Sequence, residues 1–462
     1  MRWFYVRLTV GGAATLAAVA ALPRPLPAQG FAVNEHSTCA MGRAGTAVAS
    51  PCNDGSAIVF NPAGLAFIEK GHTTISVGGT LIAPSGSFTN DVGGGESRLN
   101  NRVFPIPALY ITHGLRENIG VGIGLFAPYG LTTDWPDTSQ ARFIGYKSLV
   151  RAIYIQPTVA AKLGEFITVG AGFDLDFAHV QLRQQLELSS QPLPSPAPPG
   201  ATFANLGIPT GTPFGDLNLS GNGTSVGFHL GVIVRPAEEL SFGVRYLSRQ
   251  KASINGGFAE VNPVPTGITA AAGNPFGLPP GTDVGLALSS QFLPDSLLDD
   301  QGATTALRLP EQWVFGLSVD PMEKLRLLFD VQLTHWSVFD TLAITLANIG
   351  LQALPQNFKN TTAFRFGAEY AYSPSTALRL GYITHNAAEP AGSVTPNLPE
   401  GKRSEFTGGV GTRLGQRLHV DVAYQYINQG DRRGRTVPFG LPDNGLFSFR
   451  AHLFGASFTY AF

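Results

Sequence analysis

The sequence predicts an all-β fold: a transmembrane antiparallel β-barrel of about 14 strands, with an N-terminal hatch (plug) inside its lumen. Three observations lead to this prediction. The chain opens with a secretory signal, and no later apolar run is long enough for a transmembrane helix. From residue 71 onward, apolar and polar residues alternate in runs separated by turn residues. Only 14% of the 462 residues are charged, against roughly 25% in soluble globular proteins.

Residues 1–28 have the features of a signal peptide. Arg2 and Arg7 flank its start, Leu8 to Leu22 form the apolar region, and Ala28 fits a cleavage position. An exported chain with this pattern is expected in the outer membrane of a Gram-negative bacterium as a multi-pass barrel. We therefore divide the chain into a signal peptide (1–28), a hatch (29–70) and a transmembrane barrel (71–462).

The predicted hatch alternates poorly and contains both cysteines of the chain, Cys39 and Cys52. In an oxidising periplasm these two are expected to form a disulfide. A zinc site is the weaker alternative, because zinc usually needs four ligands and only His36 and Asp54 lie near. A barrel of this size would leak if its lumen were empty, so we expect residues 29–70 to fill it.

The predicted strands each have one apolar face and one face that carries charge. In 417–427, Leu418, Val420 and Val422 alternate with His419 and Asp421. A run of about 10 residues suits a tilted crossing of the hydrocarbon layer, and a closed barrel satisfies every backbone group there. The candidate strands are 71–84, 103–113, 118–129, 146–163, 166–188, 223–235, 239–255, 306–319, 324–346, 363–373, 375–385, 404–414, 416–428 and 447–462.

The connections predict the orientation of the barrel. Short turns such as Leu163-Gly164-Glu165 belong at the periplasmic rim, and long loops such as 189–222 and 256–305 belong outside. The last strand ends in Phe462, which resembles the signal that the barrel assembly machinery recognises in outer-membrane proteins. The expected partners are thus this machinery and outer-membrane lipid, and the barrel is expected to be a monomer.

Little in the sequence points to catalysis. Gly223 to Gly227 fits G-x-S-x-G, but no helix follows, as a nucleophile elbow requires. The nine histidines are scattered, and His419 is expected to be an ordinary lumen residue. The net charge of −1 points to no nucleic-acid partner. We therefore expect no enzyme activity, no metal and no cofactor.

Several motifs together resemble a known family, the long-chain fatty acid transporters of the outer membrane, which include aromatic-hydrocarbon channels. The most specific of them is Phe60-Asn61-Pro62-Ala63-Gly64 in the predicted hatch. The others span the mature chain in order: Gly30 to Ala32, Met41 to Gly45, Pro105 to Tyr110, Ala127 to Thr132, Leu309 to Trp313, Thr334 to Ser337 and Asn357 to Lys359. The cysteine pair is a departure from the family pattern and is expected to make part of the hatch more rigid.

The resemblance implies passive transport of a hydrophobic substrate. The substrate is captured outside, binds in the lumen, and leaves laterally into the membrane when the hatch rearranges and the third strand kinks inward. The expected gating residues are Phe60, Asn61, Pro62, Ala63 and Gly64. In the third strand, Gly120, Gly122, Gly124 and Pro128 are expected to weaken the wall, although the glycines can instead serve to pack the hatch.

The resemblance also places basic ligand-binding residues near Lys359 and near His179 or Arg183. A carboxylate in an apolar lumen needs such a cation. Long-chain fatty acids are the expected substrates, and uptake of aromatic hydrocarbons is the alternative. A barrel hydrolase or a general porin is less expected, because no Ser/His/Asp grouping is visible and the hatch argues against an open pore.

Overall fold

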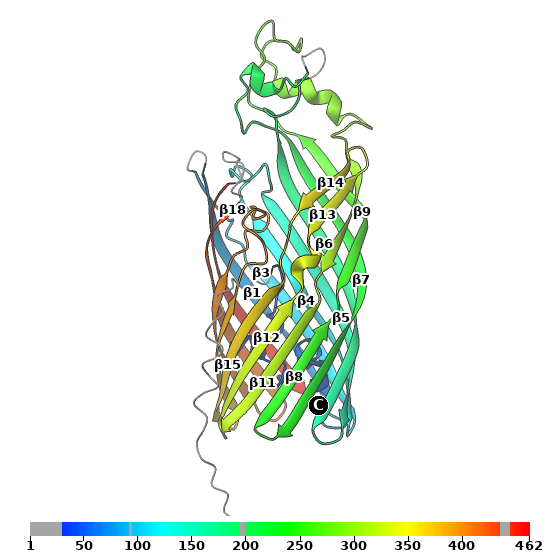
Figure 1. Cartoon of the computed structure of the whole chain (residues 1–462), viewed down its shortest axis with the longest axis vertical. Helices are drawn as coiled ribbons and strands as arrows, with labels where there is room; N and C mark the ends of the chain where they lie inside the picture. The colour runs from blue at the N-terminus through cyan, green and yellow to red at the C-terminus, as the bar shows by residue number, and fades with distance from the viewer. Residues whose placement is uncertain (1–29, 92–94, 194–198, 435–443) are drawn as a thin grey trace, which may run out of the picture.

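The structure is a computed structural model that describes residues 30–91, 95–193, 199–434 and 444–462. The predicted signal peptide lies outside the described residues. Within them, the chain forms a closed, 14-strand antiparallel barrel (Figure 1). The barrel closes where β1 pairs with β19, from Thr74 opposite Ala461 to Asn90 opposite Gly445. The predicted fold class is confirmed.

Several wall strands consist of two labelled pieces separated by a bulge or a short turn. The wall contains β1 (Thr73–Asn90), β3 (Phe104–Arg116), β4 (Ile119–Asp134), β5 (Lys147–Leu163), β6 (Ile167–Glu187), β7 (Pro213–Ala237), β8 (Leu240–Leu247) with β9 (Gln250–Pro263), β10 (Gln301–Leu309) with β11 (Gln312–Met322), β12 (Leu325–Thr334) with β13 (Thr341–Leu346), β14 (Gly350–Pro355) with β15 (Thr361–Ser373), β16 (Thr376–His385), β17 (Arg403–Leu414), β18 (Leu418–Gly434) and β19 (Gly445–Ala461). A short strand, β2 (Glu96–Arg98), lies between β1 and β3, and η4 (Trp336–Val338) lies between β12 and β13.

The alternation predicted from the sequence sets the two faces of the wall. In β18, Val422 is 52% exposed on the outer face, whereas Asp421 and Gln425 are buried in the lumen. In β19, Phe454 and Phe458 are exposed on the outer face. The barrel therefore presents apolar side chains to the membrane and polar side chains to its interior.

Turns are short at one end of the barrel and connections are long at the other (Figure 1). The long connections after β6 and β9 project beyond the wall and include η2 (Phe203–Leu206) and η3 (Val284–Phe292). These connections share an apolar cluster of their own that contains Leu188, Phe203, Phe214 and Leu288. By the usual rule for outer-membrane barrels, this end is extracellular.

The residues before β1 lie inside the barrel. They form α1 (Thr38–Gly42), α2 (Ala57–Phe60) and η1 (Pro62–Phe67). Helix α1 contacts β1 and β16 to β19, while η1 contacts β3 to β7 on the opposite wall. This segment thus crosses the lumen from wall to wall, as a plug must. No helix in the described parts of the chain has the length and apolarity needed to span a membrane.

The predicted disulfide between Cys39 and Cys52 is present in this segment. Closing a loop of about 15 residues stabilises a fold by roughly 3 kcal/mol in the chain-entropy account.

We expect the double variant Cys39→Ser/Cys52→Ser to keep a folded barrel but to loosen the hatch by up to about 3 kcal/mol, because only the hatch loop is cross-linked. Hydrogen exchange of hatch peptides measures this effect, and wall peptides provide the internal control. Unchanged exchange in residues 38–52 would show that wall contacts alone hold the hatch.

Candidate functional site

The barrel wall is incomplete between β3 and β4. These strands pair from Arg116 opposite Ile119 to Leu109 opposite Leu125, and the pairing then stops. Beyond this point β3 continues to pair with β1 as far as Phe104, and β4 continues to pair with β5 as far as Asp134. Two neighbouring strands therefore diverge, and a gap opens between residues 104–108 and 126–134.

A β-bulge in β4 produces this divergence. Phe126 faces Tyr154 and Tyr129 faces Ala152, so Ala127 and Pro128 together lie opposite the single residue Ile153. One extra residue bends the strand that carries it, and proline provides no backbone N–H for a ladder. Pro128, one of the four residues expected to weaken the third strand, therefore lies in the irregular part of the strand.

The N-terminal segment pairs with β4 where β3 does not. Ala32 forms an isolated bridge with Tyr129, the Val33 N–H donates to the Pro128 carbonyl at 2.9 Å, and the Gly130 N–H donates to the Phe31 carbonyl at 3.0 Å. Phe31 also packs edge-on against Trp336, with ring centroids 4.6 Å apart. The segment before the hatch helices thus holds the bent part of β4 in the lumen.

A cavity of about 440 Å³ extends through this gap. Its inner part is lined by lumen residues such as Phe31, Tyr129 and Leu453. Its outer part reaches Pro107 and Ile153, which belong to the outward-facing set of their strands. The cavity therefore connects the lumen with the membrane-facing side of the wall, and we call it the wall passage.

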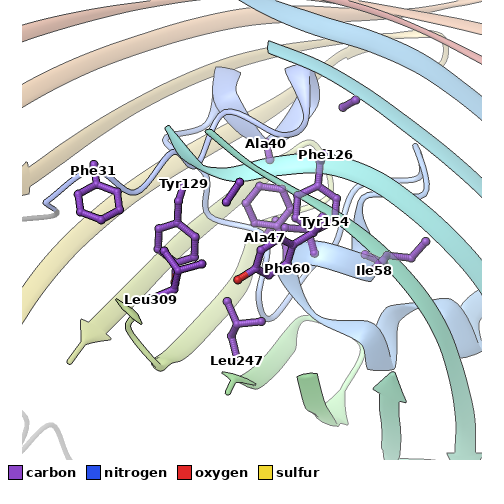
Figure 2. Packing of buried hydrophobic residues seen from close by; sticks show 14 of the residues in the cluster. Phe31, Ala40, Ala47, Ile58, Phe60, Phe126, Tyr129, Tyr154, Leu247 and Leu309 are labelled. Carbon is purple, nitrogen blue, oxygen red and sulfur yellow. The ribbon is translucent and has the colours of Figure 1, made fainter. Parts of the chain in front are cut away.

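Aromatic side chains pack around the passage. Figure 2 shows Phe126, Tyr129 and Tyr154 of the wall gathered with Phe60 and Ile58 of the hatch. The rings of Phe126 and Tyr154 lie 6.2 Å apart, as do those of Tyr129 and Tyr154. The same cluster therefore joins the hatch to the bent strand.

The lining of the wall passage contains Arg403 beside the acids Glu400 and Glu405. Within the described residues, Arg403 forms no ion pair, and its Nε donates to Gln429 Oε1 at 3.2 Å. The nearby acids have other partners. Glu405 binds His385 and Gln425, at 2.7 and 2.6 Å, and Glu400 accepts backbone N–H groups, including that of Gly30 at 2.9 Å.

Glu35 also lines the passage and belongs to the segment before α1. Burial and the nearby Glu405 carboxylate raise the pKa of the Glu35 carboxyl. Its Oε1 accepts a hydrogen bond from Gln425 at 2.9 Å. The raised pKa weakens the tendency of Glu35 to carry a negative charge in the passage, whose lining contains the cations Arg403 and Arg151.

Asn61 joins the hatch to the wall. Its side-chain amide donates to the Val48 carbonyl at 2.8 Å within the hatch and to the Val232 carbonyl of β7 at 3.0 Å. Its Oδ1 accepts from the Ala63 N–H at 3.2 Å and caps η1. Phe60, Pro62, Ala63 and Gly64 complete the predicted motif, and all of them are buried. A gating role for these residues remains a prediction.

We expect Asn61→Ala to loosen the hatch and impair uptake while the barrel stays folded. Leaving buried carbonyl and N–H groups without this partner costs roughly 1–3 kcal/mol. Asn61→Asp is the matched variant, because it keeps the oxygen that caps η1 but lacks the amide donor. Both variants should show faster hydrogen exchange in residues 57–67. If Asn61→Asp exchanges as the wild type does, the amide bonds to the wall do not hold the hatch.

His36 is a buried titratable group of the hatch, and its ring packs on Phe126 with centroids 5.0 Å apart. Burial, with help from Arg245 and Arg365, lowers the pKa of His36 from 6.5 to about 3. We call the hatch docked when it is packed against the wall, as in this structure, and undocked when His36 is exposed to water. His36 binds a proton below about pH 6.5 in the undocked hatch, but only near pH 3 in the docked hatch. Docking is favoured above pH 6.5 and weakens as the pH falls toward 3.

In the wild type, proton uptake by His36 weakens docking about tenfold for each pH unit below 6.5. We expect His36→Asn to remove this contribution to the pH dependence of docking. The raised pKa of Glu35 favours docking as the pH falls, which is opposite to the effect of His36. Glu35 is present in both proteins, so the difference between their pH profiles gives the contribution of His36. Hydrogen exchange of hatch peptides, corrected for intrinsic rates, provides the measurement. Parallel pH profiles for the two proteins would contradict this role.

The glycines predicted to weaken the third strand lie in the paired part of β4 and contact the hatch. A Cβ on Gly120 would lie 1.9 Å from the Leu65 carbonyl oxygen, and one on Gly122 would lie 3.0 Å from Ile58 Cδ1. Gly124 also faces Ile58. These glycines let the hatch approach the wall, the alternative noted from the sequence, while the gap itself begins beyond them. Their part in a lateral opening remains a prediction.

The three basic residues predicted to bind ligand lie apart from the wall passage. Lys359 is exposed in the connection between β14 and β15. His179 and Arg183 share the outward-facing set of β6 with Phe177, and Arg183 pairs with Asp216 at 3.0 Å. The structure therefore does not bring these residues together with the passage, and their ligand-binding role remains a prediction.

The structure also contains a buried polar triad that the sequence did not reveal. Thr158 Oγ1 lies 2.9 Å from His229 Nε2, and His229 Nδ1 lies 2.5 Å from Asp174 Oδ1. Because His229 and Asp174 are 1% and 0% exposed, a substrate cannot reach this Thr/His/Asp group. Ser225, from the G-x-S-x-G match, binds Asp176 and Gln250 rather than a histidine. Neither group supports hydrolysis.

Comparisons with known proteins agree with this geometry. The family model described as "Outer membrane protein transport protein (OMPP1/FadL/TodX)" matches residues 18–462. The long-chain fatty acid transport protein of Escherichia coli (strain K12) is 25% identical over 96% of this chain and 97% of its own. Outer membrane protein P1 of Haemophilus influenzae is 21% identical over 94% and 95%.

Two solved structures share the fold. A Pseudomonas aeruginosa FadL homologue superposes with a TM-score of 0.75 at 19% identity, covering 94% of this chain and 99% of its own. The Pseudomonas putida toluene transporter TodX has a TM-score of 0.64 at 16% identity, covering 94% and 99%. The likeness therefore includes a structure named as a FadL homologue and one named as a toluene transporter.

Proposed function

Because the chain belongs to the family of outer membrane transport proteins (OMPP1/FadL/TodX), we propose that it is a passive channel for hydrophobic compounds, with long-chain fatty acids as its main substrates. The observation that carries the proposal is the wall passage, an apolar cavity that runs from the lumen through the gap between β3 and β4. A substrate in this cavity can reach the membrane without entering the periplasm.

This route suits a hydrocarbon chain on energetic grounds. Each CH2 group left in water costs roughly 0.8 kcal/mol, so a long acyl chain is held back strongly from an aqueous exit. The acyl chain can contact the apolar side chains of Phe31, Tyr129 and Ile106 inside the passage and then the outward-facing Leu125. Lateral release therefore keeps the chain in apolar surroundings throughout.

Arg403 makes a fatty acid the better fit than a hydrocarbon. A carboxylate needs a cation or several donors in an apolar cavity, and an arginine fork matches it in geometry. Arg403 faces the passage and forms no ion pair within the described residues, although the Glu405 carboxylate interacts with it electrostatically. The acyl chain would then extend from this polar end toward the gap in the wall.

Aromatic hydrocarbons remain a second candidate substrate class, supported by the aromatic side chains of Phe31, Phe126 and Tyr129 in the lining of the passage. Such a ligand needs no cation and would leave Arg403 without a binding role.

Parallel uptake assays distinguish the two classes. A host that lacks its own outer-membrane fatty-acid channel is given labelled oleate or labelled toluene, with and without this protein. Uptake of oleate supports the main proposal, and uptake of toluene alone assigns the chain to hydrocarbons. If neither is taken up although the barrel is folded, the proposal is wrong.

A further inference from the structure

A second cavity, of about 510 Å³, lies on the outer face of the barrel across β5, β6, β7 and β9. Its polar lining consists of side chains from the outward-facing sets of these strands. They are Arg151, His179, Asn222, Thr224, Ser253 and Asn255. This outer-face pocket is therefore a polar site on a surface that is otherwise apolar toward the membrane.

The pocket lies where the apolar outer face ends. On β6 the outward-facing Phe173 and Phe177 are 66% and 50% exposed, and the next outward residue is His179. On β5 the outward Ile153 is followed toward the extracellular end by Arg151. Apolar bands of this kind mark the hydrocarbon layer, so the pocket lies at the level of the outer-leaflet head groups.

The positive charge around the pocket has no acidic partner. Within the described residues, Arg151, Lys251 and Arg308 form no ion pair, and each is exposed. Lys251 and Arg308 are directly opposite one another across β9 and β10, an arrangement that destabilises a sheet unless an anion lies between the charges.

Two acids on the neighbouring surface form ion pairs of their own, whereas Glu260 accepts hydrogen bonds from Asn218 and Asn262. Glu311 binds His335 at 2.5 Å and Arg249 at 3.8 Å, and Asp216 binds Arg183 at 3.0 Å. The free positive charge is therefore available to an anion from outside the chain.

We propose that the outer-face pocket binds the phosphate group of a lipid in the outer leaflet. Arg151 provides a guanidinium fork that matches phosphate oxygens, while the amides of Asn222 and Asn255 provide neutral donors. The acyl chains of the same lipid would lie along Phe173 and Phe177. Lys251 and Arg308 would be neutralised by the same head group or by a second phosphate on it.

The outer-face pocket adjoins the wall passage. Arg151 and Ile153 line both cavities, so the bound lipid would lie beside the outer mouth of the passage. The proposal itself does not depend on which substrate the channel carries.

Native mass spectrometry of the full protein in detergent tests the proposal. The probe is an acylated glucosamine disaccharide with two phosphates, compared with the same lipid after enzymatic removal of the phosphates. We expect the wild type to retain one phosphorylated lipid, and Arg151→Ala/Lys251→Ala to retain roughly tenfold less, as loss of charge-assisted bonds implies. The dephosphorylated lipid should bind the wild type as weakly as the phosphorylated lipid binds the variant.

The matched control is Lys324→Ala/Arg417→Ala, which removes two exposed cations from turns at the opposite rim. It should retain lipid as the wild type does. Equal retention of both lipids by the wild type would overturn the proposal, as would unchanged retention by Arg151→Ala/Lys251→Ala. Displacement of the lipid by inorganic phosphate alone would identify a free-anion site and would also overturn it.

Discussion

Deletion of Pro128 should reduce uptake of hydrophobic substrate to nearly the level of cells without the channel. The bulge in β4 contains one residue more than the facing stretch of β5, so removing one residue lets the strand run straight. Residues beyond Phe126 could then pair with residues 104–108 of β3, and the wall passage would close. We expect at least a tenfold loss of uptake, because an acyl chain would have to cross water instead.

Pro128→Ala is the matched control for this deletion. It restores a backbone N–H but keeps the extra residue, so the bulge and the gap should persist with most of the uptake. Both variants must be shown to be folded, for example by their heat-dependent migration in gels. Wild-type uptake by the folded deletion variant would show that substrate does not pass between β3 and β4.

Arg403→Gln should weaken binding of a long-chain fatty acid by roughly 10- to 100-fold, the usual range for loss of hydrogen bonds to a charged group. Binding of a neutral hydrocarbon should not change, because such a ligand has no carboxylate to pair with the guanidinium. The glutamine keeps a polar side chain of similar length beside Gln429. Titration of the purified protein with both ligands gives the comparison.

Arg413→Gln is the control, since Arg413 lies on the same strand but is exposed and donates to the Pro374 carbonyl at 2.8 Å. It should bind both ligands as the wild type does. An equal loss for both ligands in Arg403→Gln would point to damage to the cavity rather than to recognition of charge.

Most of the fold could be predicted because apolar and polar residues alternate within each strand, and this pattern can be read from the strand's own sequence. The predicted segment 416–428 corresponds to β18, and its apolar face is the one exposed to the membrane. The ends were less accurate, since β7 begins at Pro213 rather than near 223. There the strand extends beyond the membrane, and the polar residues Asp216, Asn218 and Ser220 alternate with Leu217 and Leu219, without the apolar outer face that marked the other strands.

The site could be predicted only in part. Pro128 could be singled out because proline has a local effect on a strand, but the bulge itself was not predicted. Arg403 was missed because the sequence does not show which of the many lumen charges remains unpaired. This depends on how the closed wall and the hatch place Glu405, Gln425 and His385.

The placement of His179 could have been anticipated from the sequence. It follows Phe173, Leu175 and Phe177 at two-residue spacing, so it belongs to the same outward-facing set. The family resemblance suggested a lumen role for this position, but the alternation in this chain places it outside. Local periodicity is the stronger guide where an alignment is weak.

The central claim, that substrate leaves the lumen through the gap between β3 and β4, is tested most directly by photolabelling. A long-chain fatty acid with a diazirine near its methyl end is bound to the protein in membranes, illuminated, and its attachment sites are mapped by mass spectrometry. The account predicts labels at Phe104–Pro107 of β3 and Leu125–Gly130 of β4. Labels confined to the hatch and to the short turns of the periplasmic rim would contradict it.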